Sequence, residues 1–447
     1  MPKMKMPGPE ELGNLSSVFK ASGLKQKLIF TLLMLLLFRF GAQIPLYGID
    51  AERFMALAGG NNIIGFLDLF SGGALGKISI FALGIGPYIT ASIIMQLLTA
   101  VIPKLEELQK EEGEAGRRQI AQYTRYFTVV LAIFQSVVLM SLINRSSAYT
   151  PGINPLLFNL GALVALVSGA ILVMYIGELI TEKGVGNGGS LLIFFGIIAG
   201  IPVYAKKTWE LVANDPGKQF ALVILLLIFF ATIVLVVIMQ EAVRKIIIVN
   251  AKRQVGNKVY GGGNTHIPFK INPGGVMPII FAVAILLLPA TVLGVLQEVS
   301  MKAPPAVQVV VDFFNSIFTP GSFSYNGIYF ALIVFLTFFY ASIMPNMQPK
   351  EIATNLKKYG SAIPGVKPGK PTAELLDRIL GRVTFIGAMG LGIVALIPSM
   401  ACTFTEITTL QGIGATALII IVGVALDTVN QIRTHMLARQ YEGFLRQ

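Results

Sequence analysis

The run KQFALVILLLIFFATIVLVVIMQ at residues 218–240 decides the class of fold. After Lys218 this run contains no charged residue. A helix rises 1.5 Å per residue, so about 20 apolar residues reach across the roughly 30 Å of a bilayer's hydrocarbon core. A helix apolar on every side has no face to turn toward water. The run therefore predicts a membrane-spanning helix.

Similar apolar runs occur along the whole chain, separated by stretches that are rich in charge, glycine or proline. Together they predict ten membrane spans, whose ends are uncertain by a few residues. The predicted spans are 27–46, 77–98, 121–143, 156–180, 188–206, 218–240, 274–296, 326–345, 379–399 and 410–430.

The overall composition agrees with a membrane protein and excludes an ordinary soluble globule. Of 447 residues, 54% are hydrophobic and only 13% are charged, whereas soluble domains are about one quarter charged. One cysteine, Cys402, excludes an intramolecular disulfide, and two histidines, His266 and His435, are too few for a His-based metal site. We therefore expect no metal and no cofactor.

Basic residues are distributed unevenly between the two sides of the predicted membrane. The N-terminus and the even-numbered gaps between spans hold most of them, and the net charge is +12. Cytoplasmic loops carry an excess of Lys and Arg, so both termini are predicted to be cytoplasmic. Residues 1–26 then form a cytoplasmic amphipathic N-terminus, because no cleavage site for a signal peptide follows them. The opposite side holds only Arg53, Lys77, Arg145, Lys206, Lys207, Lys218 and Lys302.

The short apolar segment 62–72, NIIGFLDLFSG, does not fit a simple list of spans. As a helix it would reach only about 16 Å, and Ser71-Gly72-Gly73 at its end is a natural hinge. A segment at half depth is tolerated where protein encloses it or where it lines a water-filled cavity. It is therefore either a movable stopper in a pore or an interfacial helix, and sequence physics leaves both open.

Catalytic motifs are missing from the chain. It contains no HExxH, no GxSxG and no GxxxxGK[ST], which argues against an intramembrane enzyme. A secondary transporter would place acidic residues near the middle of the membrane. The ionisable residues within the spans instead lie toward their ends, where a structural role is expected; they are Arg39, Arg125, Glu178 and Asp427.

Six stretches are similar to the SecY family, the central subunits of the Sec translocon. They follow one another in the family's order and cover nearly the whole chain. The stretches are FSGGALGKISIFALGIGPYITASIIMQLL (70–98), EEGEAGRRQIAQYTRY (111–126), GELITEKGVGNGGSLLIFFGIIAGIP (177–202), VNAKRQVGNKVYGGGNTHIPFKINPGGVMPIIFA (249–282), NLKKYGSAIPGVKPGKPTAELLD (355–377) and ARQYEGFL (438–445).

This resemblance implies an all-α membrane protein with two pseudo-symmetric five-helix halves, 27–206 and 207–430, around an hourglass pore. Segment 62–72 becomes a short plug helix with Leu67, Asp68 and Phe70 near the pore axis. Residues 431–447 become a cytoplasmic tail. A lateral gate would open between spans two and three on one side and seven and eight on the other.

The resemblance also implies a ring of apolar side chains that seals the pore around a translocating chain. The matching positions are Ile85, Ile89, Gly189, Ile193, Ile280 and Ile420. Gly189 departs from the family, which commonly has a bulky aliphatic residue there, so the sequence leaves the tightness of the ring open at this position. Ordinary helix packing would explain any one of these isoleucines by itself.

Two polar residues, Gln96 and Asn187, match the family's lateral gate, although Asn187 is equally suited to capping the fifth helix. The basic loops 241–273 and 346–377 are either docking surfaces or merely solvated. The resemblance favours docking of the SecA motor ATPase and the ribosome, through Lys245, Lys252, Arg253 and Lys367. Lys367 replaces an arginine that is typical of the family, and it lacks that residue's forked hydrogen-bonding head.

The function implied is a gated protein-conducting channel, not an enzyme. It would pass unfolded secretory chains across the membrane and release membrane-protein helices sideways into lipid, driven by SecA or the ribosome. The implied partners are the small subunits SecE and SecG, signal sequences and nascent chains, and membrane lipids, with SecDF and YidC as further candidates. The implied location is a bacterial plasma (inner) membrane, or a thylakoid membrane where the cell has one.

Overall fold

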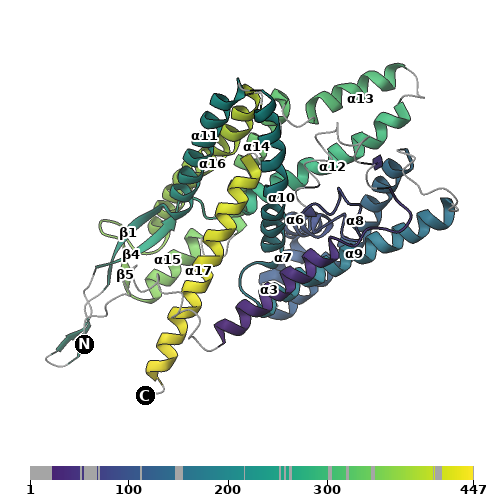
Figure 1. Ribbon diagram of the computed structural model, residues 1–447. Coiled ribbons are helices and arrows are strands. Elements are labelled where there is room, and N and C mark those ends of the chain that lie inside the picture. Colours follow the sequence, from purple (N-terminus) through teal and green to yellow (C-terminus); the bar gives the residue numbers. More distant parts are fainter. Residues whose placement is uncertain are drawn as a thin grey trace. The chain divides into compact units, whose positions relative to one another are not determined.

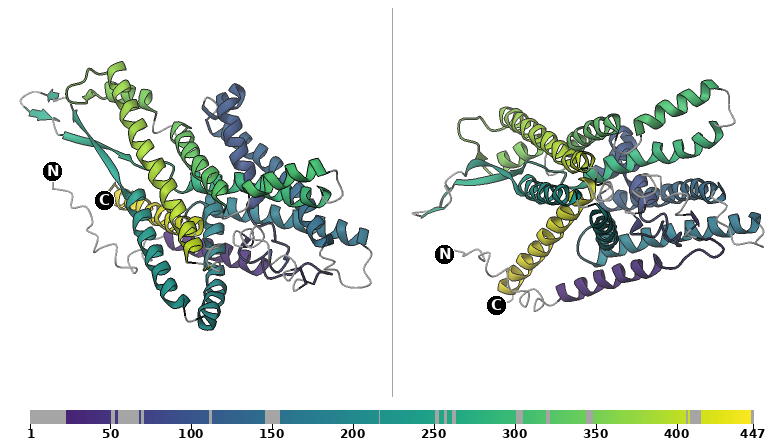
Figure 2. Two further views of the ribbon diagram at one scale, coloured as in Figure 1. Left: turned by 90° about the horizontal axis from the view of Figure 1, so that it is seen from above. Right: turned by 45° about the horizontal axis from the view of Figure 1, so that its top comes forward.

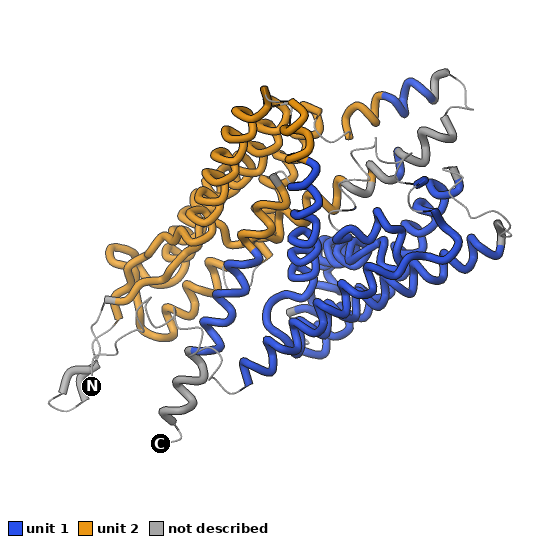
Figure 3. Tube along the Cα trace, in the orientation of Figure 1, with its two compact units in different colours: residues 1–207, 290–312, 424–447 blue, residues 208–289, 313–423 orange. Residues whose placement is uncertain are grey.

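The computed structural model describes the chain in fifteen stretches, and every structural statement below concerns these residues. They are 23–50, 53–54, 68, 71–110, 113–145, 155–215, 217–250, 253–255, 258–260, 264–300, 305–318, 322–343, 348–405, 407 and 415–445. The chain divides into two compact units, shown in Figure 3. Unit 1 comprises 1–207, 290–312 and 424–447, and unit 2 comprises 208–289 and 313–423.

Unit 1 is built from helices that pack side by side, labelled in Figure 1. α6 lies against α8, and α9 lies against both α8 and α3. The long helices are free of interior proline up to Pro202 in α10. Their bounds are α3 Leu24–Gly41, α6 Gly86–Val101, α7 Pro103–Lys110, α8 Gly113–Arg145, α9 Pro155–Lys183 and α10 Gly188–Asn214.

A hydrophobic core in unit 1 attaches the turns at 42–50 and 72–85 to the helices. Ile78 is fully buried against Ile143 of α8 and Leu166 of α9 in one cluster. The rings of Phe38 and Phe81 stack with their centroids 6.1 Å apart. The non-helical chain ahead of α6 is therefore packed in protein, as an irregular backbone at membrane depth must be.

Unit 2 is organised around α16 (Lys370–Phe404). α11 (Lys218–Glu241) and α14 (Phe323–Ile343) both pack on it, and α15 (Pro349–Lys358) packs near its start. Four helices cross the boundary between the units and belong to both. They are α10, whose residues from Thr208 onward lie in unit 2, α12 (Met277–Ser300), α13 (Pro305–Phe318) and α17 (Ala415–Leu445).

Unit 2 also contains two small antiparallel sheets. One has the strand order β4-β1-β5, formed by β1 (Val243–Asn250), β4 (Asn264–Lys270) and β5 (Ser361–Ala362). In its register Ile246 pairs with Ile267, and Asn250 pairs with Ser361. The other sheet pairs β2 (Arg253–Val255) with β3 (Lys258–Tyr260).

Each of the ten predicted spans overlaps a helix, and the fold is that of a multi-pass helical membrane protein. Seven described helices are long and apolar enough to cross a membrane, or eight if the bent pair α6 and α7 counts as one span. Of the other two, α3 contains three charged residues, Lys25, Lys27 and Arg39, and the apolar described part of α12 is the short stretch Met277–Leu286.

The second predicted span differs most from its helix. We expected it to begin at residue 77, but α6 begins at Gly86, after a series of turns. Gly84 has a φ of +55°, which interrupts a right-handed helix, and Pro87 occupies the first turn of α6. The backbone N–H and C=O groups ahead of α6 form hydrogen bonds with a distant segment and not within a helix. Leu46 N donates to Ile78 O at 2.9 Å, and Ile80 N donates to Ile44 O at 3.1 Å.

Candidate channel elements and docking surface

Asp68 is the predicted plug residue that the structure describes, whereas Leu67 and Phe70 lie outside the described residues. The Asp68 carboxylate oxygen Oδ1 accepts a hydrogen bond from Gly76 N at 2.6 Å. Ser71 Oγ donates to Asp68 O at 3.0 Å and accepts from Leu75 N at 3.0 Å. This carboxylate therefore closes the turn that leads out of the plug segment.

The predicted hinge is held at Gly72 by contacts with two helices. Arg39 Nη1, from α3, donates to Gly72 O at 2.6 Å. Gly72 has a φ of +70°, and a Cβ placed there would lie 2.9 Å from the Cα of Gly196 in α10. A side chain at Gly72 would therefore meet both backbone strain and a backbone neighbour. The base of the plug segment is seated against α3 and α10.

Two positions of the predicted ring meet in unit 1. Ile85 directly precedes α6, Gly189 lies in the first turn of α10, and the Cδ1 atom of Ile85 is 3.7 Å from the place that a Cβ at Gly189 would occupy. Ile193 is buried one turn further along α10, and Ile89 is half-buried on α6. The turn ahead of α6 thus brings Ile85 to the start of α10.

The other two ring positions belong to unit 2. Ile280 lies on α12 and Ile420 on α17, and both side chains are buried. Burial of an isoleucine is equally consistent with ordinary helix packing, so for these two residues a place in the ring stays a prediction.

The two predicted gate residues make local hydrogen bonds. Asn187 precedes α10, and its Oδ1 accepts from Ser190 N at 3.2 Å, as an N-cap residue does. Gln96 Nε2 donates to Ser92 Oγ at 3.5 Å within α6. The capping role that we considered for Asn187 is therefore present, and the gate role of both residues stays a prediction.

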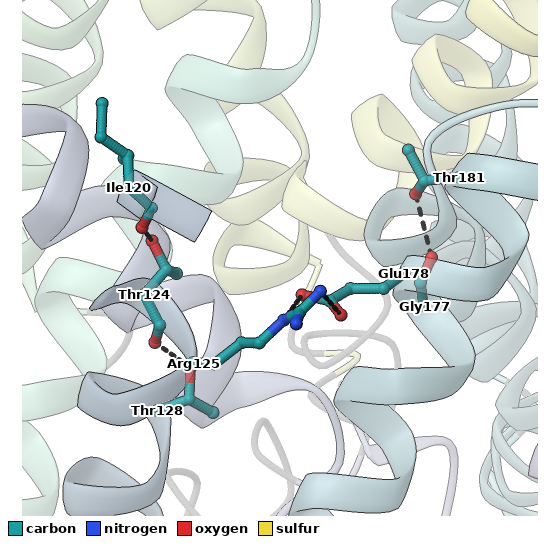
Figure 4. Close-up of polar contacts among 7 residues, drawn as sticks. All are labelled: Ile120, Thr124, Arg125, Thr128, Gly177, Glu178 and Thr181. Carbon is teal, nitrogen blue, oxygen red and sulfur yellow. Dashed lines mark hydrogen bonds and ion pairs between the residues drawn. The ribbon is translucent and has the colours of Figure 1, made fainter. Parts of the chain in front are cut away.

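Arg125 and Glu178, which we expected to be structural charges, form an ion pair between α8 and α9 (Figure 4). Arg125 Nε donates to Glu178 Oε1 at 3.0 Å, and the Nη2 atom of the same arginine lies 2.9 Å from Oε2. This fork-to-fork geometry is the strongest form of an arginine–carboxylate pair. Next to it on α9, Thr181 Oγ1 donates to Gly177 O at 2.9 Å and accepts from Gly188 N at 2.9 Å.

The two basic loops fold together into one surface, which we call the loop sheet: β1, β4, β5 and the turn 363–369. β5 of the later loop pairs with β1 of the earlier one, and Ser361 Oγ lies 2.8 Å from Asn250 Oδ1 in a hydrogen bond. Ile246, Phe269 and Ile363 form its core with two leucines of α16. Figure 2 shows its strands beyond the helices of unit 2.

The predicted docking residues that the structure describes lie on the loop sheet with exposed side chains. Lys245 is on β1, and Lys367 is in the turn that precedes α16. Thr372 Oγ1 donates to Lys367 O at 2.8 Å, which attaches this turn to the helix. Arg253 belongs to β2, where the structure describes only its backbone, and Lys252 lies outside the described residues.

Comparison with known proteins establishes the family. The family model SecY matches residues 79–429. The protein translocase subunit SecY of Synechococcus elongatus is 45% identical over 434 residues, which cover 96% of this chain and 95% of that one. The chain belongs to the SecY family. The protein translocase subunit SecY of Aquifex aeolicus, another relative, is 43% identical and covers 97% of this chain and 99% of its own.

Solved structures show the family's fold over almost the whole chain. The solved structure of a protein-conducting channel superposes on this chain with a TM-score of 0.67 at 19% identity. The match covers 98% of this chain and 96% of that chain. Sec61 in the canine ribosome–channel complex from the endoplasmic reticulum superposes with a TM-score of 0.63 at 17% identity. That match also covers 98% of this chain and 96% of the other. The ten-helix, two-half architecture predicted from the SecY resemblance is the architecture of this fold.

Sequence reasoning did not predict three of the pairings described above. They are Arg39 with Gly72, Arg125 with Glu178, and Asn250 with Ser361. The partners lie 33, 53 and 111 positions apart, so no local spacing rule connects them. For Arg39 and for Arg125 with Glu178, the available signal was the position of a charge within a predicted span, which demands a partner without identifying it. Asn250 and Ser361 are uncharged and carried no such signal.

Proposed function

We propose that this chain is the protein-conducting subunit of a protein translocase. It passes unfolded secretory polypeptides across the membrane and releases membrane-protein helices sideways into lipid. The observation that carries the proposal is similarity, end to end, to protein translocase subunits at 43–45% identity. The channel performs no covalent chemistry; among the described residues, no group of three or more His, Cys, Asp and Glu side chains could hold a metal.

The geometry around Gly72 supports a plug that rests in the closed channel. Arg39 donates to the backbone at the hinge, and the Asp68 carboxylate closes the turn behind it. In one solved relative, the plug domain of the SecY protein stabilises the closed state of the translocation channel and maintains a membrane seal. For this chain we propose the same role for 62–72, with Leu67, Asp68 and Phe70 at the pore.

The proposed ring is loose at Gly189, which leads to a prediction about resting ion leak. Gly189→Ile should lower the leak several-fold, because the new side chain would extend the apolar seal beside Ile85. Its Cβ would lie 3.7 Å from Ile85 Cδ1, an ordinary contact, and 3.3 Å from Asn187 Oδ1, which must shift slightly. The measurement is single-channel or vesicle conductance of the closed protein.

Gly161→Ile is the matched control for this prediction. Gly161 lies on α9 with no atom within 4 Å of its Cβ position, so the same added side chain should leave conductance unchanged. Equal conductance of Gly189→Ile and the unmodified protein would contradict the idea of a loose ring.

The loop sheet supports docking of a large partner. It presents Lys245 and Lys367 on one folded core instead of two separate flexible loops, so partner and channel can exchange force through a stiff element. We propose SecA and the ribosome as these partners. Two solved relatives are bound to ribosomes: Sec61 in the canine ribosome–channel complex and the yeast Ssh1 complex on the yeast 80S ribosome. Contacts to rRNA phosphates or acidic motor surfaces should weaken with salt.

The remaining partners and the location are proposed on the family resemblance. SecE and SecG would complete the channel, SecDF and YidC would act beside it, and signal sequences would enter through the gate at Gln96 and Asn187. The membrane is a bacterial plasma membrane, or a thylakoid membrane where one exists. Both termini are cytoplasmic, because the lysines and arginines concentrate on that side.

Protease protection of a radiolabelled preprotein tests the proposed function. The chain is reconstituted into liposomes with a SecE-like partner, and the preprotein is added with or without SecA and ATP. Protected preprotein that appears only with SecA and ATP is the expected result. Absence of protection, from folded and correctly oriented protein with a compatible motor, would overturn the channel proposal and favour a transporter of small solutes.

A further inference from the structure

α13 stands out among the shorter helices of the chain. It spans Pro305–Phe318, and its apolar part is too short to cross a membrane, since 14 residues of helix extend about 21 Å. It follows α12 after residues 301–304 and precedes α14 after residues 319–322. Because both neighbours are predicted membrane spans, these short connections hold α13 close to the end of both, at the boundary between membrane and water.

The apolar side chains of α13 form one exposed stripe. Val309, Val310, Phe313 and Phe314 are 68%, 54%, 61% and 44% exposed. Their spacing of one and four residues puts them on one side of a helix. The rings of Phe313 and Phe314 meet edge to face with centroids 5.9 Å apart.

The opposite side of α13 is polar. Asp312 is exposed there, and Gln308 and Asn315 share this side, whereas Ser316 lies at its edge, three positions from Phe313. Each polar residue follows another after three or four positions, so the two sides do not intermix. The helix is amphipathic along its described length.

Two other short helices of the chain provide a comparison. α7 and α15 expose charged side chains, and no large apolar side chain of either is exposed among their described residues. Both helices are therefore suited to contact with water. An exposed stripe of two valines and two phenylalanines in water would cost about 25 cal/mol for each Å² of apolar surface, so the stripe of α13 requires an apolar environment.

The structure points to lipid as that environment. We propose that α13 is a membrane-surface helix that lies along the interface, with Val309, Val310, Phe313 and Phe314 among the upper acyl chains and Asp312 toward water. α13 contains no Lys or Arg, so the attraction is to acyl chains and not to anionic headgroups. The helix would fix the height of the α12–α14 connection relative to the bilayer.

Tryptophan quenching in vesicles tests this placement. Trp209 is the single tryptophan of the chain, so Trp209→Phe supplies a silent background in the full-length protein. Phe314→Trp and Asp312→Trp then report on the two sides of α13, because residues two positions apart lie on nearly opposite sides of a helix. The vesicles contain zwitterionic phosphatidylcholine brominated either near the headgroup end or near the middle of the acyl chains.

Shallow bromines should quench the indole introduced by Phe314→Trp several-fold more than the indole introduced by Asp312→Trp, and mid-chain bromines should quench both less. Adding anionic phosphatidylglycerol should leave this difference unchanged. Val310→Trp repeats the measurement on the same stripe if Phe314→Trp does not fold. Equal quenching on both sides, strong quenching by mid-chain bromines, or no quenching on the stripe would overturn the proposal.

Discussion

Lys367→Glu is expected to reduce SecA-driven export by at least about tenfold, the largest change in activity that we predict. Lys367 is exposed on the turn that precedes α16. The hydrophobic core of the loop sheet and the hydrogen bond from Thr372 hold that turn in place. Reversing its charge places a repulsive group where an acidic motor surface would dock. A loss of about 1.4 kcal/mol in the free energy of docking is enough to weaken the affinity tenfold. The measurement is the rate of preprotein protection in proteoliposomes with SecA and ATP.

Two further variants separate a local docking role from a general effect of charge. Lys358→Glu makes the same charge change on an exposed side chain at the end of α15, and it should reduce export much less. Lys367→Arg keeps the charge and adds the forked head, so export should be retained or raised. Equal losses from both glutamate variants, or an equal loss of ribosome-driven helix insertion, would contradict the docking role.

Gly188→Ala is expected to destabilise the folded protein by about 3 kcal/mol, at the upper end of overpacking costs. A Cβ at Gly188 would lie 1.9 Å from the carbonyl oxygen of Gly177, so α9 and α10 would have to separate. Neither helix can move freely, because Thr181 hydrogen-bonds across this same contact. The measurement is the midpoint of thermal unfolding in detergent, together with protease resistance.

Gly161→Ala provides the control for this prediction, because Gly161 is a helical glycine of α9 with open space around it. There the change should be neutral or slightly stabilising, since alanine favours helix. An unchanged unfolding midpoint for Gly188→Ala would show that α9 and α10 do not approach as closely as the structure has them.

The membrane fold and the candidate site differ in how far the sequence predicts them. α11 coincides with the run 218–240 almost residue by residue, because a helix in lipid satisfies its own backbone and needs no distant partner. The start of α6 was missed by nine residues, since residues 77–85 are as apolar as a span but form turns that pack against α8 and α9. Hydropathy does not distinguish apolar residues that face lipid from those that face protein.

The sequence by itself determined that this is a membrane protein, where its helices lie and, through its long motifs, which family it belongs to. Only the tertiary structure decided that Ile85 meets Gly189, that Arg39 bonds to Gly72, and that two loops more than 100 positions apart share one sheet. The physical reason is the distance along the chain between the residues that interact. Helices in lipid form from local hydrogen bonds and local apolarity, whereas hinges, seals and docking surfaces depend on contacts between residues that are distant in the chain.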